Sequence, residues 1–195
     1  MTDFAYSCAN GRTENFDTFF YGELNGDLLI SVYDGMKKHI NKVSSSFART
    51  IRNGGVHLSL KGIVNYLKNV RKLPTEEEVA FCTCRLHNNN ITVEWCGTNR
   101  VYLIREGVLY QLTSGINSEN WDGKTLSDNH KFTISAHEGD VIFMCTDGAY
   151  GRLTDSFMQE MWKCNPYMGD FCMSLIEESR KTGCRDNQTI VAFGI

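Results

Sequence analysis

The stretch that decides the fold is residues 79–112, with the sequence VAFCTCRLHNNNITVEWCGTNRVYLIREGVLYQL. It holds four short segments rich in apolar and β-branched residues, which is the composition of β-strands. These segments are Val79–Leu86, Ile91–Cys96, Val101–Arg105 and Val108–Leu112. Turn-forming residues, Asn88-Asn89-Asn90 and Glu106-Gly107, separate neighbouring segments. Strands this short and this closely joined predict an antiparallel β-meander.

Further strands are expected on both sides of this meander. They are predicted at Phe4–Cys8, Thr18–Tyr21, Leu28–Tyr33, Phe132–Ile134, Asp140–Cys145 and Thr189–Phe193. Apolar residues at helical spacing predict helices at about 36–52, 59–70, 154–163 and 168–181, and the polar residues 114–129 predict a surface loop. Helices that are grouped, without alternating with strands, favour an α+β fold. We therefore expect two packed antiparallel β-sheets flanked by helices, an αββα sandwich.

Length and composition set limits on the kind of protein. A chain of 195 residues with 42% hydrophobic and 22% charged residues predicts one globular domain over residues 1–195. The net charge of −3 gives no electrostatic reason to expect binding to nucleic acid or to a membrane. No signal peptide or membrane-spanning run is visible, so a cytoplasmic location is expected. The eight cysteines contain no CxxC pair, which favours buried free thiols over a zinc site.

Four aspartates, each in its own short motif, are the main functional signal. They are Asp17, Asp34, Asp147 and Asp186, and most of them adjoin a predicted strand. Carboxylates at strand ends can meet at one edge of a sheet, where they repel one another unless a cation lies between them. Oxygen ligands of this kind suit Mg²⁺, Mn²⁺ or Ca²⁺. Taken singly, each aspartate is as well explained by a turn or a cap.

Five stretches together resemble the motifs of the metal-dependent (PPM, type 2C) serine/threonine protein phosphatases. In chain order they are Gly11–Asp17, Val32–Gly35, Trp95–Leu103, Glu138–Gly148 and Gly183–Thr189. They occur in the family's order and extend from about residue 11 to the end of the chain. Each motif alone is weak, because Asp-Gly is mostly a turn signal. Their combination identifies the chain as similar to a minimal, partly degenerate member of that family.

The resemblance implies specific metal ligands. Asp34, Asp147 and Asp186 would hold a first Mn²⁺ or Mg²⁺, and Asp34 would bridge to a second ion. The carbonyl of Gly35 would bind this second ion. Asp17 would be both a catalytic and a metal-site residue, which hydrogen-bonds to metal-bound water or ligates a metal through it. We expect one tight site and a second, weaker one.

The resemblance also implies a reaction and a substrate. Arg12 would hold the phosphate through its two-pronged guanidinium group. Two divalent ions can activate a water molecule for in-line attack, so phosphomonoester hydrolysis would need no covalent intermediate. The expected partner is a phosphorylated protein.

Several residues depart from the family pattern. The acidic residue expected just before Asp17 is Phe16, and Gly151 stands where the family often has a further aspartate. Met36-Lys37-Lys38 replaces a His-Gly-Gly segment, and Glu76–Ala80 replaces a Gly-Thr-Thr segment. These changes leave a second interpretation open: a weak or inactive relative that binds a phosphoprotein through the inherited cleft. They also predict that Phe16→Asp or Phe16→Glu raises activity at low metal concentration.

Overall fold

The computed structural model describes residues 3–11, 15, 17–24, 26–35, 79–113 and 130–195. The helices predicted at 36–52 and 59–70, the loop predicted at 114–129, and residues Arg12 and Phe16 lie outside these ranges. No helix within the described ranges is both long and apolar enough to cross a membrane.

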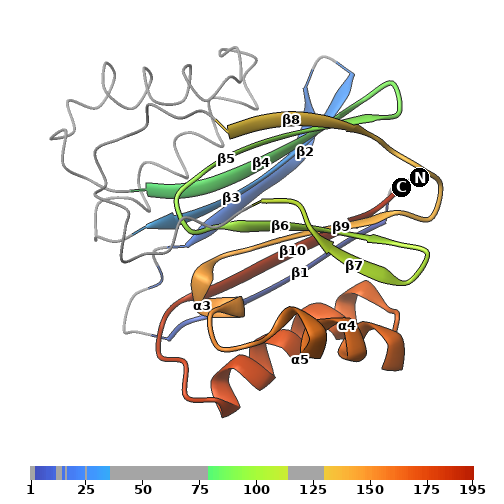
Figure 1. Ribbon diagram of the computed structural model, residues 1–195. Helices are drawn as coiled ribbons and strands as arrows, with labels where there is room; N and C mark the ends of the chain where they lie inside the picture. Colours follow the sequence, from blue (N-terminus) through green and yellow to red (C-terminus); the bar gives the residue numbers. More distant parts are fainter. Residues whose placement is uncertain (1–2, 12–14, 16, 25, 36–78, 114–129) are drawn as a thin grey trace, which may run out of the picture.

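The described strands form two five-stranded antiparallel sheets that pack face to face (Figure 1). Sheet A has the order β1 (Phe4–Ala9), β10 (Gln188–Gly194), β9 (Val141–Cys145), β6 (Arg100–Arg105), β7 (Val108–Gln111). Sheet B has the order β2 (Thr18–Leu24), β3 (Asp27–Gly35), β4 (Val79–His87), β5 (Asn90–Cys96), β8 (His130–Ser135). The α+β class with two packed antiparallel sheets is therefore confirmed, and every predicted strand in the described ranges is present.

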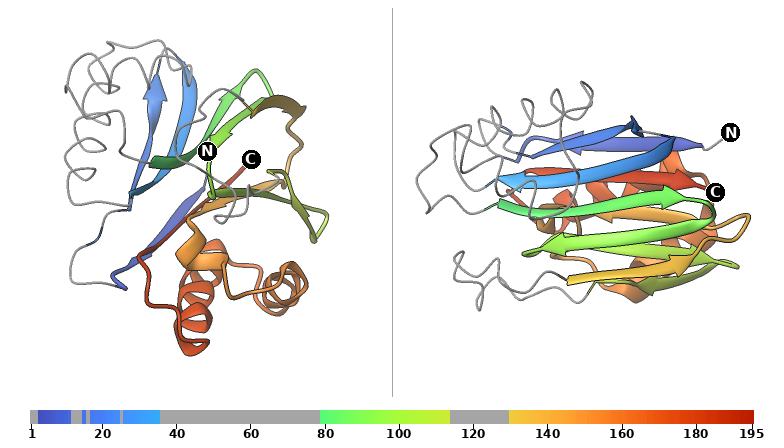
Figure 2. Two further views of the ribbon diagram at one scale, coloured as in Figure 1. Left: turned by 60° about the vertical axis from the view of Figure 1, so that its left-hand side comes forward. Right: turned by 90° about the horizontal axis from the view of Figure 1, so that it is seen from above.

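Three described helices cover the outer face of sheet A (Figures 1 and 2). They are α3 (Asp147–Tyr150), α4 (Asp155–Cys164) and α5 (Met168–Lys181). Helix α4 begins where the sequence predicted, because the Thr154 side chain accepts a hydrogen bond from the Phe157 N–H. Helix α3 was not predicted, since four residues are too few to show helical periodicity.

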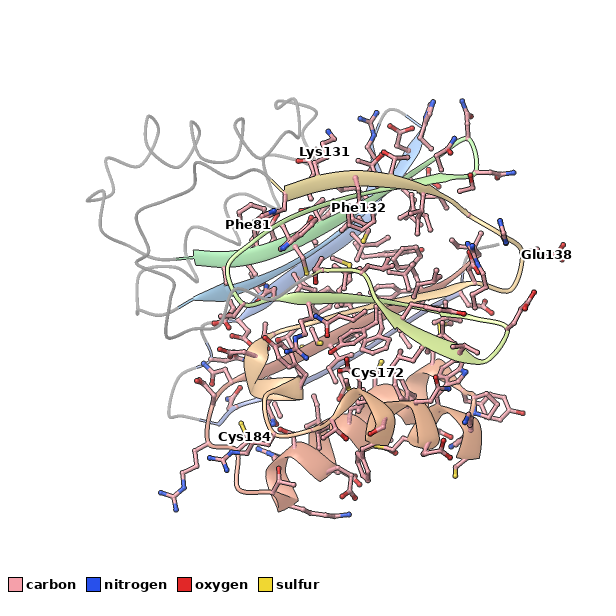
Figure 3. All side chains as sticks on the ribbon, in the orientation of Figure 1. Phe81, Lys131, Phe132, Glu138, Cys172 and Cys184 are labelled. Carbon is pink, nitrogen blue, oxygen red and sulfur yellow. The ribbon has the colours of Figure 1, made fainter. Side chains whose placement is uncertain are left out.

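Two apolar cores explain why the central strands of sheet A are apolar on both faces. In β9, Ile142 and Met144 point toward sheet B, while Phe143 and Cys145 point toward the helices. Figure 3 labels one residue of each core. Phe132 packs in the core between the two sheets, and Cys172 lies in the core between sheet A and the helices. A strand buried on both faces has a continuous apolar sequence, as Val141–Cys145 does.

The two ends of the sandwich differ in character. The chain termini lie together at one end, where the Gly194 N–H donates to the Asp3 carbonyl (Figure 1). At this end Arg105 also forms a two-pronged ion pair with the buried Asp140, at 2.8 and 2.6 Å. The opposite end carries α3 and the last residues of β3 and β9. The predicted aspartates lie at this second end.

Candidate metal centre

Each of the four aspartates lies beside a strand at the α3 end of the sandwich. Asp34 is the penultimate residue of β3, and Asp17 directly precedes β2, the antiparallel neighbour of β3. Asp147 is the first residue of α3, just after β9, and Asp186 lies two residues before β10, which pairs with β9. Two aspartates thus come from each sheet, and both pairs lie at the same end of the molecule.

The carboxylates are close enough to influence one another strongly. Burial raises the pKa of Asp34 well above its ordinary value, and the charges of Asp17, Asp147 and Asp186 raise it further. Burial and the charge of Asp186 also raise the pKa of Asp147. A hydrogen bond joins the side chains of Asp34 and Asp147, and it lowers the pKa of Asp147 while raising that of Asp34. The carboxylates of the two sheets therefore disfavour being charged at the same time.

Asp17 is held from the sheet A side. Its side chain is 8% exposed, and burial raises its pKa to about 7. The Thr146 hydroxyl donates to Asp17 Oδ2 at 2.8 Å, and this bond opposes the rise. The same hydroxyl oxygen accepts from the Thr189 backbone N–H at 3.0 Å, so the Thr146 side chain has a fixed direction. This role was not predicted, because a threonine that follows a strand carries no distinguishing sequence signal.

Two glycines let the backbones around Asp186 come close together. A Cβ atom on Gly148 would lie 2.0 Å from the Asn187 carbonyl oxygen. One on Gly11 would lie 1.9 Å from the Asp186 carbonyl oxygen. The Gly11 N–H also donates to Asn187 Oδ1 at 3.3 Å. Glycine is required at both positions because any side chain would push these segments, and the aspartates they carry, apart.

The carbonyl of Gly148 is a second anchor for the start of α3. It accepts hydrogen bonds from Ser179 Oγ at 2.8 Å and from Gln188 Nε2 at 3.0 Å, and both donors are buried. Cys184, labelled in Figure 3, donates its thiol proton to the same carbonyl at 3.1 Å. These contacts fix the peptide between Gly148 and Ala149, one residue after Asp147. Cys184 and Gln188 lie in one of the motifs named above, but their contact with Gly148 crosses the fold and has no local sequence signal.

The donor chemistry fits a hard divalent cation. Four carboxylates gather at one end of the sandwich, and both burial and neighbouring carboxylates raise the pKa values of Asp17, Asp34 and Asp147. Mg²⁺ or Mn²⁺ would relieve this repulsion and is suited to oxygen ligands. In the part of the chain that is described, however, no three acidic, histidine or cysteine side chains are arranged around one common point. The carboxylates interact with one another without enclosing a single point.

Comparisons with known proteins give the same fold. No family model and no curated protein matches the sequence. The serine/threonine phosphatase PstP/Ppp of Mycobacterium tuberculosis is 19% identical, with a TM-score of 0.76 over 100% of this chain and 98% of that one. The catalytic domain of PstP in complex with two manganese ions is 19% identical, with a TM-score of 0.75 over 99% and 97%. The S. agalactiae serine/threonine phosphatase is 16% identical, with a TM-score of 0.76 over 100% of both chains.

These likenesses establish a shared fold across the chain. The protein has the fold of the PPM, or type 2C, serine/threonine phosphatases, as the sequence resemblance predicted. At identities of 16–19%, activity and ligands have to be argued from the residues themselves.

Proposed function

We propose that this protein is a metal-dependent phosphomonoester hydrolase, and specifically a serine/threonine protein phosphatase. The observation that supports this most is the position of Asp17, Asp34, Asp147 and Asp186, which come from distant parts of the chain to one end of a PPM-type sandwich. A cluster of like charges is costly to bury, and a bound cation would offset their repulsion. We propose one domain over residues 1–195. The cytoplasmic location stays a prediction.

We assign the residues as follows. Asp34, Asp147 and Asp186 would hold the first Mn²⁺ or Mg²⁺, while Asp34 and the Gly35 carbonyl would hold a second, weaker ion. When bound, the ions would supply an activated water nucleophile and neutralise charge on the phosphate. The PstP catalytic domain, which shares the fold, is known with two manganese ions.

The remaining roles belong to the chain's own polar groups. Asp17, oriented by Thr146, would accept a hydrogen bond from water near the metals. Arg12, which follows the closely packed Gly11, would bind the phosphate oxygens of a phosphorylated protein. The proposed reaction uses no cysteine nucleophile. Burial raises the pKa values of the Cys82, Cys84 and Cys145 thiols. Thiols in that state are poor nucleophiles.

The experiment is hydrolysis of p-nitrophenyl phosphate and of phosphothreonine and phosphotyrosine peptides, with Mn²⁺, with Mg²⁺ and with chelator. We expect metal-dependent turnover that favours phosphothreonine and falls by about a hundredfold or more in Asp147→Ala. Asp170→Asn is the matched control, because Asp170 is an exposed carboxylate on α5 that accepts from Asn165. Turnover that persists in chelator or in Asp147→Ala would contradict the proposal.

A second candidate function is a phosphoprotein-binding relative without turnover. Phe16 removes one expected ligand, and the described carboxylates do not surround a common point. Gly151, in place of a further aspartate, lies in a tight turn where a Cβ would be 2.7 Å from the Asp147 carbonyl oxygen. If this second function is correct, the phosphothreonine peptide binds but is not hydrolysed at any metal concentration.

A further inference from the structure

Asn99 makes a polar link between the two sheets at the metal end of the sandwich. It lies in the turn between β5 and β6, immediately before the first strand residue of sheet A's β6, and its side chain is 0% exposed. Its Nδ2 donates to the Val32 carbonyl at 3.1 Å and to the Ala80 carbonyl at 3.4 Å, both in sheet B. Val32 is two residues before Asp34, and Ala80 is the cross-strand partner of Asp34. Asn99 therefore binds the backbone on both strands beside the Asp34 carboxylate.

The preceding residue, Thr98, makes the matching contacts on the sheet A side. A hydrogen bond from its side chain lowers the pKa of Asp147. Its carbonyl accepts a hydrogen bond from the Tyr150 hydroxyl, on the same short helix as Asp147. Two consecutive residues of one turn thus contact the backbone near Asp34 and the carboxylate of Asp147.

Other polar links between the sheets lie elsewhere: Thr146 donates to Asp17 just before β2, and Arg105 donates to the Ser135 carbonyl on β8. The core between the sheets consists of apolar side chains, and apolar contact allows small sliding movements because it depends on area more than on angle. A buried amide is costly unless it is hydrogen-bonded, and Asn99 Oδ1 has no partner among the described atoms. An apolar residue of similar size would avoid this cost but could not donate to the two carbonyls. The hydrogen-bonding of Asn99 instead suits a role in fixing how one sheet sits on the other.

We propose that Asn99 is a positioning residue that sets the separation of Asp34 and Asp147 and thereby the affinity of the metal centre. The inference rests on the proposed function for its metal, but the geometry it describes exists without one. If Asn99 merely completes a local turn, removing its amide lowers stability. Hydrogen exchange at residues 32–35 and 147–150 and the affinity for Mn²⁺ then stay unchanged.

The test compares Asn99→Leu, which keeps the approximate volume and removes both donors, with Ser31→Ala. Ser31 is the matched control: its hydroxyl is buried and bonds to Thr83 Oγ1 at 3.1 Å between the neighbouring strands β3 and β4, within sheet B only. Asn99→Ser, whose hydroxyl is too short to reach the same carbonyls, is the second variant in case the leucine does not fold.

Two measurements are made on each variant. Without metal, hydrogen exchange of peptides covering 32–35 and 147–150 should accelerate about tenfold in the Asn99 variants and stay unchanged in Ser31→Ala. In Mn²⁺ titrations by calorimetry, the Kd should rise about tenfold or more for the Asn99 variants and stay unchanged for the control. In the Asn99 variants, unchanged exchange in both peptides, 32–35 at the end of β3 and 147–150 in α3, would overturn the inference, and so would an unchanged Kd. A wild type that binds no Mn²⁺ would overturn the metal role in the proposed function, and the exchange measurement would then decide the positioning role alone.

Discussion

The hydroxyl of Thr146 is the contact whose removal gives the clearest prediction. It accepts from the Thr189 N–H at 3.0 Å and donates to Asp17 Oδ2 at 2.8 Å, and Thr146 is 0% exposed. Thr146→Val keeps the shape of the side chain and removes both bonds. No cavity is created, so any loss of stability comes from the polar contacts.

The size of the effect follows from what each partner loses. The Thr189 N–H becomes a buried donor without this acceptor, which costs about 1–3 kcal/mol. The bond to the Asp17 carboxylate is worth about 1.5–3 kcal/mol when the carboxylate is charged. We therefore expect the free energy of unfolding to fall by about 3 kcal/mol, which for a chain of this length lowers the melting temperature by about 10 °C.

The assay is thermal unfolding followed by circular dichroism in chelator, so that metal binding does not contribute. Thr146→Ser is the control, because it keeps the hydroxyl and loses only a methyl group; it should recover most of the lost stability. If Thr146→Val melts within about 2 °C of the wild type, the hydroxyl is not holding the β9, β10 and Asp17 segments together as described.

Three further predictions test other parts of the argument. Gly148→Ala should lose about 3 kcal/mol or more of stability, because its Cβ would clash with the Asn187 carbonyl oxygen. Gly169→Ala is the control and should be neutral or stabilising, because a Cβ there meets nothing within 4 Å. Equal melting temperatures for the two variants would contradict the close approach at Gly148. Burial alone would raise the pKa of Asp140, but the hydrogen bonds from Arg105 and the His137 N–H lower it below its ordinary value. Because protonation then breaks these bonds, the stability of the wild type should fall as the pH drops below about 4. Asp140→Asn should lose about 3 kcal/mol at neutral pH and show a shallower acid decline, and an acid decline as steep as that of the wild type would exclude this source. Phe16→Asp should raise turnover at low Mn²⁺, and an unchanged metal titration would mean that another residue supplies the missing ligand.

The strand pattern was predictable because it depends on residues that are close together in the sequence. Val141–Cys145 is apolar throughout since its residues alternate between two cores, and Thr154 caps α4 through a bond to a residue only three positions away. Both features depend on neighbouring positions in the chain. Helix α3 was missed for the opposite reason: its four residues are fixed by contacts to the Gly148 carbonyl from Ser179 and Gln188.

The sequence by itself determined the two-sheet α+β class and singled out Asp17, Asp34, Asp147 and Asp186 as the predicted metal-site residues. Only the tertiary structure decided the contacts around them: the bond from Thr146 to Asp17, the bonds from Asn99 to the backbone near Asp34, and the close approaches at Gly11 and Gly148. The physical reason is distance along the chain. A strand's periodicity is set by its own residues, whereas a hydrogen bond between Thr146 and Asp17 spans 129 positions and exists only once both sheets have packed.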